Sequence, residues 1–359
     1  MSGLSPYLTH RVLGEWEVAL AAAHQHGQRN AEKFIQEVCW RTYWKGWLEH
    51  RPQVWTDYLR SVQAAYDRLN SGGSLGLAKA REGNTGIACF DAWANELVAT
   101  GYLHNHARMW FASIWVFTLK LPWELGADFF MQHLLDGDAA SNTLSWRWVG
   151  GLQTVGKHYL ARPDNIARFT ENRFPDTPGL VLDATPLKGK PAPAPRPLQL
   201  ADDVTPEGRW GLLLLEHDLM PETLVGGAPS ALAGALCSAF RSPRPVAEPV
   251  VDFSLGALKD GLTRGAEAFN LTPEACPVLD DARSILAWAE ENALDTLVVS
   301  HPTAGPAADF VAPLAKDLAV AGRRLQPVVR PWDRAAWPHA QKGFFKFKSQ
   351  IPALLSVIG

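Results

Sequence analysis

The sequence predicts a helical domain followed by a Rossmann-like α/β domain with a parallel sheet. Three observations along the 359 residues support this division. Apolar residues recur with a helical period up to about residue 175, and a proline-rich stretch without such a period follows. Strand-like and helix-like segments then alternate to the end. We therefore expect a helical domain at 1–175, a linker at 176–208 and an α/β domain at 209–359.

Long amphipathic helices account for most of the first part. The stretches GEWEVALAAAHQHG and NAEKFIQEVCWRTYWKGWLEHRPQVWTDYLRSVQAAYDRLN place apolar residues three or four positions apart. Gly101 is expected to cap the helix FDAWANELVATG, and Pro122 is expected to stop the helix NHARMWFASIWVFTLKL. These segments predict an all-α domain with few strand signals.

Short apolar runs and amphipathic stretches alternate in the last part. We expect strands at WGLLLLEHD, PVVDFSL, ACPVLD, DTLVVSH and LQPVVRP. We expect helices at APSALAGALCSAFR, LGALKDGLTRGAEAF, DARSILAWAEENAL and PAADFVAPLAKDLAVAG. This alternation predicts a parallel sheet with helices on both faces. The sequence contains neither G-x-G-x-x-G nor a P-loop, so the usual nucleotide sites are not expected.

Composition limits the classes of function. The net charge is −3, so a protein that is basic throughout is excluded, and DNA binding would need a local basic patch. No apolar run approaches the roughly 20 residues that span a bilayer, and the N-terminal residues lack a secretion signal. The cysteines form no C-x-x-C pair, so we expect reduced thiols, no metal site and a cytoplasmic location. They are Cys39, Cys89, Cys237 and Cys276.

Tryptophan is distributed unevenly. Eleven of the 15 tryptophans precede residue 150, and Trp40, Trp44 and Trp47 fall on one helical face. The stretch LLDGDAASNTLSWRW (134–148) adds two aspartates and an asparagine beside two of these indoles. Aromatic side chains pack cores, but they also stack on bases and transfer electrons. The stretch therefore predicts one of two things. Either the indoles pack in the core beside a solvent-exposed turn, or the stretch forms the site of a planar redox-active ligand.

Four motifs, in order over roughly residues 2–150, resemble the FAD-binding domain of the cryptochrome/photolyase family. They are SGLSPYL (2–8), which resembles its flavin-phosphate loop, FIQEVCWRTYW (34–44), NTGIACFDAWANELVATGYLHNHARMW (84–110) and LLDGDAASNTLSWRW. The α/β part resembles the antenna domain, which normally comes first in that family. The order of the two parts therefore resembles that of a circularly permuted photolyase-like protein, a rearrangement that exposed chain ends make inexpensive.

The resemblance implies an FAD site. It assigns contacts with the FAD phosphates to Ser2, Leu4 and Ser5, and a phosphate or flavin contact to Arg41. It implies a buried, bidentate ion pair between Asp136 and Arg108 beside the flavin ring. It places the amide of Asn142 at flavin N5, where it can donate or accept a hydrogen bond without adding charge. The remaining flavin contacts that it implies are Asn105 and Asp138.

The resemblance also implies electron transfer through aromatic side chains. Trp146 and Trp123 match the first two members of the family's tryptophan chain. The third tryptophan falls near Asn70 and is missing. Tyr66, Trp44 and Trp115 are the possible substitutes, and a shorter chain of donors is the other possibility.

A pocket for a flipped-out pyrimidine dimer is the last implication for the helical domain. Glu37 would hydrogen-bond the base edge, and Trp40 and Trp148 would stack on the lesion, which offsets the cost of unstacking it. The remaining residues that match this pocket are Arg41 and Met109.

The function implied by the resemblance is light-driven repair of cyclobutane pyrimidine dimers in DNA. One electron would pass from excited reduced FAD to the dimer, with Trp146, Trp123, Asn142 and Glu37 as the catalytic residues. The alternative is a cryptochrome-type blue-light photoreceptor that acts on a signalling partner without repairing DNA. A second, antenna chromophore in the α/β domain is a further implication, and an empty antenna site is the alternative to it.

Overall fold

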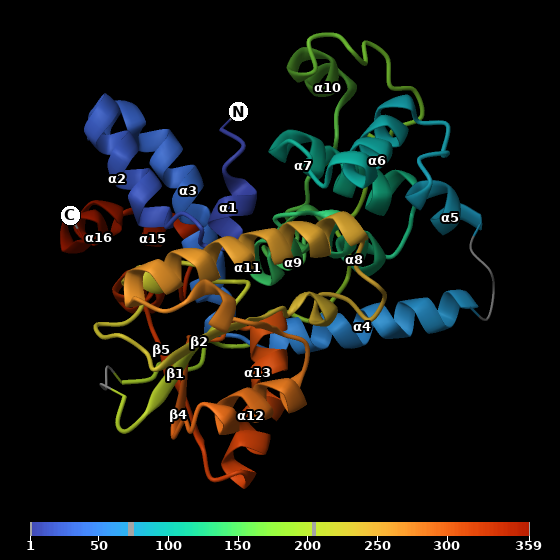
Figure 1. The fold of residues 1–359 in the computed structure, drawn as a ribbon. Coiled ribbons are helices and arrows are strands. Elements are labelled where there is room, and N and C mark those ends of the chain that lie inside the picture. The colour runs from blue at the N-terminus through green and yellow to red at the C-terminus, as the bar shows by residue number, and fades with distance from the viewer. Residues whose placement is uncertain (1, 71–74, 203–205, 359) are drawn as a thin grey trace. The chain divides into compact units, whose positions relative to one another are not determined.

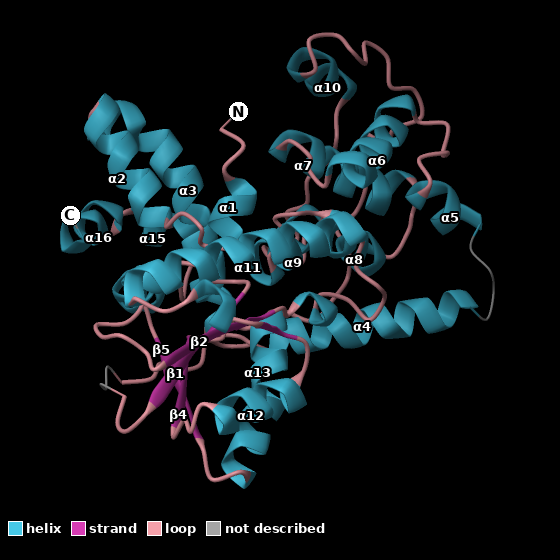
Figure 2. Cartoon of the chain, viewed as in Figure 1, coloured by secondary structure: helices cyan, strands magenta, loops and turns pink. Residues whose placement is uncertain are grey.

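The computed structural model describes residues 2–70, 75–202 and 206–358 (Figures 1 and 2). The chain forms two compact units. Unit 1 comprises Met1–Pro52, Pro195–Arg241 and Val251–Gly359, and unit 2 comprises Gln53–Ala194 and Ser242–Val250. The segments 1–175, 176–208 and 209–359 divide the chain differently, because the first 52 residues belong to the same unit as the sheet.

A five-stranded parallel sheet forms the centre of unit 1. The strand order is β3-β2-β1-β4-β5, so the sheet grows in both directions from the neighbouring strands β1 and β4. Leu212 of β1 lies opposite Leu232 of β2 and Val298 of β4. The strands are β1 (Trp210–Leu215), β2 (Ala231–Ala235), β3 (Val278–Leu279), β4 (Thr296–Ser300) and β5 (Arg324–Val328).

Helices cover both faces of this sheet (Figure 1). On one face, α12 (Ala282–Glu291) and α13 (Pro306–Val320) pack on the buried side chain of Leu213. On the other face, α11 (Glu248–Phe269) packs on Leu212. Because both faces are covered, β1 is apolar throughout and does not alternate. The predicted parallel α/β arrangement is confirmed.

The predicted helix at APSALAGALCSAFR is wrong. The segment forms β2 and a 3₁₀ turn, Ser238–Phe240. All five residues of β2 are buried, and a Cβ on Gly234 would lie 2.7 Å from Leu258 Cδ1 of α11. Small residues here let the helix approach the sheet closely, so packing outweighs the helix propensity of alanine.

The predicted strand at PVVDFSL is also wrong, because this segment begins helix α11. Val250, Ser254 and Leu258 recur every fourth residue, and all three are fully buried. The two adjacent valines suggest a strand locally, but the longer helical period of burial decides the structure.

The N-terminal helices of unit 1 pack on its C-terminal segments. A Cβ on Gly46 of α3 would lie 2.6 Å from Trp337 Cδ1, so this glycine permits close approach of the two segments. Gly27, with φ +78°, separates the paired helices α2 and α3. The remaining helices of unit 1 are α1 (Ser5–Thr9), α2 (Glu15–His26), α3 (Gln28–Glu49), α14 (Pro331–Ala336), α15 (Phe344–Lys348) and α16 (Ile351–Ile358), with 3₁₀ turns at Pro221–Thr223, Pro273–Ala275 and Trp337–His339.

Unit 2 is helical. Gly101 caps its helix in the left-handed conformation, as predicted, and the helical segment before Pro122 ends in a π-helical turn, Ile114–Thr118. Between Phe169 and Trp210, the described residues form no helix or strand. No described helix of either unit is long and apolar enough to cross a bilayer. The helices are α4 (Gln53–Asn70), α5 (Leu75–Arg81), α6 (Ala88–Thr100), α7 (Asn105–Ser113), α8 (Trp123–His133), α9 (Ala139–Val149) and α10 (Pro163–Phe169).

Candidate functional site

In unit 1, Arg41 of α3 connects the two ends of the short helix α1. Its Nη2 donates to Ser5 Oγ at 2.7 Å, and its Nη1 donates to Thr9 Oγ1 at 2.6 Å. The two hydroxyls are four residues apart, which is one helical turn. Leu4 is half-buried and Ser2 is exposed. A cation beside two hydroxyls suits an anionic group, and Thr9 is a member that the sequence analysis missed although its spacing from Ser5 signals it.

In unit 2, Arg108 and Asp136 form the expected ion pair, but not in the expected geometry. Nη2 of Arg108 donates to Asp136 Oδ2 at 2.9 Å, while Nε donates to the Leu103 carbonyl at 2.8 Å. The guanidinium therefore joins the carboxylate to the backbone, and the bidentate pair predicted from the sequence is wrong. The Asp136 side chain is buried, so the pair fixes the start of the turn before α9.

Asp138 and Asn142 begin helix α9. Asp138 is the N-cap and accepts the Ser141 N–H at 2.7 Å. One turn later, the buried Asn142 donates from Nδ2 to the Ala127 carbonyl at 2.8 Å. Its carbonyl oxygen receives no hydrogen bond from the described residues, so it is an oriented acceptor. Asn105, the first residue of α7, is exposed.

Trp146 of α9 lies in an aromatic cluster. Its ring meets Trp115 edge-on at 6.2 Å between centroids, and both indoles are buried. A Cβ on Gly126 would lie 2.3 Å from Trp146 and 2.9 Å from Trp115, so only glycine allows this packing. Trp115 is therefore a direct neighbour of Trp146, which the sequence could not reveal.

Trp123, the first residue of α8, contacts another aromatic residue. Its ring lies 5.8 Å from that of Tyr58, and no ring contact joins it to Trp146 within the described chain. The side chain of Asn70, where the third tryptophan is missing, lies outside the described residues. Trp44, another possible substitute, lies in unit 1, where its ring is 5.3 Å from that of Trp40.

Tyr66, the last possible substitute, donates its hydroxyl to Asp128 Oδ2 at 2.7 Å. Burial raises the pKa of Asp128, and hydrogen bonds from neighbours such as Ser242 and Tyr66 only partly offset it. Burial, with a contribution from Asp128, raises the pKa of Tyr66 to about 12. The sequence analysis missed Asp128, since nothing in its sequence context distinguishes it from a solvent-exposed helical residue.

The residues expected to line the lesion pocket belong to both units. In unit 1, Trp40 stacks on Phe344 with ring centroids 3.7 Å apart, and Glu37 is exposed. In unit 2, Trp148 is 37% exposed and stacks on Tyr159 at 5.7 Å. Met109 is half-buried. The contact of Phe344 with Trp40 is another feature that the sequence analysis missed.

A comparison with known protein families shows which domain these residues resemble. Residues 34–176 match the family model described as the FAD binding domain of DNA photolyase. These residues are therefore similar to the FAD-binding domain of the photolyase/cryptochrome family. Within unit 2, the oriented amide acceptor of Asn142 suits a flavin N–H. Within unit 1, the cationic Arg41 with the Ser5 hydroxyl suits a phosphate group.

Relatives of this chain include deoxyribodipyrimidine photo-lyases. A deoxyribodipyrimidine photo-lyase of Thermus thermophilus is 38% identical over 160 residues, which is 44% of this chain and 37% of the relative. That of Streptomyces griseus is 34% identical over 178 residues, or 46% and 38%. That of Escherichia coli (strain K12) is 32% identical over 201 residues, or 50% and 39%. The matched region thus spans less than two fifths of each of these relatives.

Proposed function

We propose that this chain uses FAD to repair cyclobutane pyrimidine dimers in DNA with light. The observation that carries the proposal is the match of residues 34–176 to the FAD binding domain of DNA photolyase. The names of the relatives support it, since each is a deoxyribodipyrimidine photo-lyase. The order of the parts along the chain, with the sheet at residues 210–328 after the matched region, supports the permutation that we also propose.

Bound FAD would supply a one-electron donor that light excites. In unit 1, we assign phosphate binding to Arg41, Ser2, Leu4 and Ser5, because the guanidinium already contacts one of these hydroxyls. In unit 2, the Asn142 carbonyl would accept a ring N–H, and its hydrogen bond to Ala127 prevents the amide from turning. We assign the other flavin contacts to Asn105, Arg108, Asp136 and Asp138.

The protein's own electron donors begin at Trp146 in this proposal. The contact of Trp115 with Trp146 supports Trp115 as a neighbouring donor. Trp123 and Tyr58 form a second pair. Tyr66 has a buried carboxylate, Asp128, that can take its proton when it is oxidised.

On the substrate side, Glu37 would accept a hydrogen bond from a base, and Trp40 would stack on the lesion. Met109 and Trp148 would complete the pocket, because both retain some exposure. The alternative function is a blue-light photoreceptor of cryptochrome type. The observation that favours it is Phe344, which covers one face of Trp40. An antenna chromophore in the α/β part and a cytoplasmic location remain part of the proposal.

Repair is tested by illuminating the reduced, FAD-loaded protein with UV-irradiated oligothymidylate. We expect absorbance at 260 nm to recover as dimers split. Replacement of Glu37 by Gln should slow recovery about tenfold without loss of flavin absorbance, because one hydrogen bond to the lesion is weakened. Glu32→Gln, an exposed change on the same helix, is the matched control and should repair normally.

Two outcomes would contradict the proposal. Photoreduction of the flavin without any recovery at 260 nm would assign the chain to the photoreceptor class. Equal recovery by the Glu37→Gln and wild-type proteins would remove Glu37 from the lesion pocket. Loss of flavin absorbance in Arg41→Gln, with the fold unchanged by circular dichroism, would support the assignment of Arg41 to FAD.

A further inference from the structure

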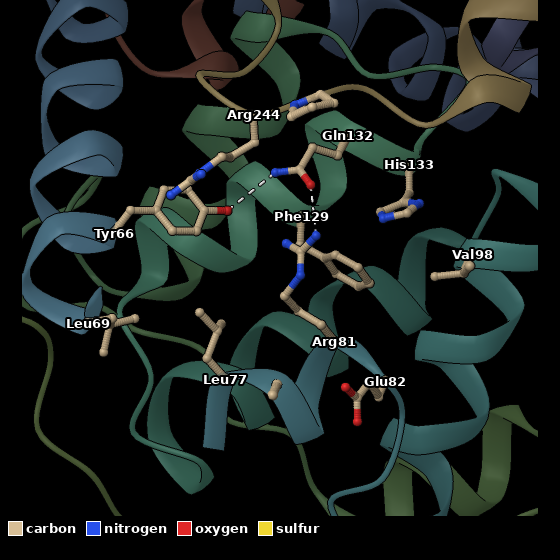
Figure 3. A pocket seen from close by; sticks show the side chains of 12 residues that line it. Tyr66, Leu69, Leu77, Arg81, Glu82, Val98, Phe129, Gln132, His133 and Arg244 are labelled. Carbon is tan, nitrogen blue, oxygen red and sulfur yellow. Dashed lines mark hydrogen bonds between the residues drawn. The ribbon is translucent and has the colours of Figure 1, made fainter. Parts of the chain in front are cut away.

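Unit 2 contains an open hollow of about 910 Å³ (Figure 3). Its walls come from α4, α5, α6, α8 and the segment 242–250. Tyr66, a possible electron donor, is one of its lining residues; the others have no assigned role in flavin or DNA binding. The volume falls within the range of small-molecule sites, about 300–1,000 Å³.

Two guanidinium groups enter this hollow, each resting on an aromatic ring. Arg81 Cζ lies 4.9 Å from the centre of Phe129, and its Nη2 donates to Gln132 Oε1 at 2.8 Å. Arg244 Cζ lies 4.7 Å from the centre of the Tyr66 ring. Figure 3 shows the Gln132 amide hydrogen-bonded to Arg81 and to the Tyr66 hydroxyl. Cation–π contacts of this kind hold the guanidinium planes in place.

Neither arginine forms an ion pair with a described residue, although the charge of Arg81 partly offsets the effect of burial on the pKa of the nearby Asp128. Within the described part of the chain, neither Arg81 nor Arg244 lies within 4.0 Å of a carboxylate oxygen. Nη1 of Arg81 is buried and has no hydrogen-bond partner among the described residues. A buried N–H of a cation without a partner carries a desolvation cost, so the hydrogen-bonding capacity of Arg81 is not satisfied by the protein.

The other ionisable residues that line the hollow leave its positive charge largely in place. Burial, with a contribution from Arg81, lowers the pKa of His133 to about 4, so this ring is neutral at pH 7. Glu82 is the one carboxylate among the described lining residues, and it is exposed. Leu77 and Val98 provide apolar surface beside the charged groups.

We propose that this hollow binds a small phosphate monoester with an apolar body, held at its phosphate by Arg81 and Arg244. A phosphate monoester carries a charge of about −1.5 to −2 at pH 7, which matches two guanidinium groups better than a singly charged carboxylate does. The planar fork of arginine fits phosphate oxygens. The apolar body would lie against Leu77 and Val98.

Isothermal titration calorimetry of the full-length, FAD-loaded protein with phenyl phosphate tests the proposal. We expect measurable binding of phenyl phosphate, weaker binding of inorganic phosphate and none of phenol. Arg81→Gln and Arg244→Gln should each weaken binding about tenfold or more, because each loses a charge-assisted hydrogen bond. Arg60→Gln, which removes an exposed guanidinium from α4 outside the hollow, is the matched control and should bind normally.

A variant that is expected to bind more tightly keeps the proposal testable if an arginine variant fails to fold. Glu82→Gln alters an exposed side chain and should strengthen binding about threefold, because it removes repulsion between two negative charges. The proposal is overturned if wild-type protein does not bind phenyl phosphate, or if the arginine variants bind it as tightly as Arg60→Gln does. Tighter binding of benzoate than of phenyl phosphate would overturn the choice of phosphate.

Discussion

Two buried aspartates, one in each unit, have opposite electrostatic environments. In unit 1, Arg330 donates to both carboxylate oxygens of Asp218, at 2.6 and 2.5 Å, and Arg11 donates to it at 3.3 Å. In unit 2, the contacts of Asp128 come from neutral groups, the Tyr66 hydroxyl and the Gln132 amide. Burial raises the pKa of both carboxyls, but in Asp218 the arginines reverse the shift and lower the pKa below its usual range. Burial alone therefore does not decide whether a carboxylate is stabilised.

The charged partners of Asp218 belong to a larger network that connects distant segments of unit 1. Arg11 donates to both oxygens of Asp333 at 2.6 Å and contacts Glu15 at 3.3 Å. These side chains come from the region after α1, the start of α2, the end of β1 and helix α14. Paired charges thus specify which segments of this unit belong together, whereas neutral hydrogen bonds surround the buried carboxylate of unit 2.

The largest expected effect comes from breaking the network at Asp218. We predict that Asp218→Asn lowers the free energy of unfolding by about 3–5 kcal/mol, because two buried arginines lose their carboxylate. Urea denaturation followed by circular dichroism measures this loss. Asp57→Asn, which breaks an exposed pair with Arg60, is the control and should cost less than about 1 kcal/mol. Equal losses in the two variants would contradict the role given to the network.

A smaller effect is expected from the packing of unit 2. Gly126→Ala should lower the free energy of unfolding by about 1–3 kcal/mol, because the new methyl group collides with Trp146 and Trp115. Gly256→Ala, at an exposed site in α11 with open space around it, should instead stabilise the protein by up to about 1 kcal/mol. Thermal unfolding checks both signs, and stabilisation by Gly126→Ala would show that the cluster is loosely packed.

The smallest expected effect is a difference between Asp218 and Asp128 in how the stability of the protein depends on pH. The pKa of Asp218 is lowered in the folded state, so its contribution to stability is present above the unfolded value of about 3.9 and is lost as pH falls below it. The pKa of Asp128 is raised, so its contribution is present below that value and is lost as pH rises through the folded pKa. Between pH 4 and 7, Asp128→Asn should therefore gain stability relative to wild type as pH rises.

Urea titrations at several pH values measure this change. Asp218→Asn should be less stable than wild type by a nearly constant amount between pH 4 and 7, and this difference should shrink as pH falls below about 3.9. The same sign of pH dependence in both variants would contradict the assignment of opposite environments to the two aspartates.

Local pattern was sufficient for most of the elements. The helical period predicts α3 and α4, Gly101 predicts a left-handed cap, and the apolar run WGLLLL predicts a buried strand, all of which the structure confirms. The same local pattern failed for β2 and for the start of α11. Alanine-rich and valine-rich segments carry a weak local preference, so contacts with the rest of the sheet decide their conformation.

The sequence by itself predicts which side chains would contact the flavin, since the ordered motifs around Ser5, Arg41 and Asp138 are present in the sequence. Only the tertiary structure showed which residues these and neighbouring side chains contact. Arg108 also donates a hydrogen bond to a backbone carbonyl, and Trp40 stacks on Phe344. Asp128 accepts a hydrogen bond from the Tyr66 hydroxyl. Such partners are separated by many residues along the chain, and they meet only because burial of apolar surface brings their segments together.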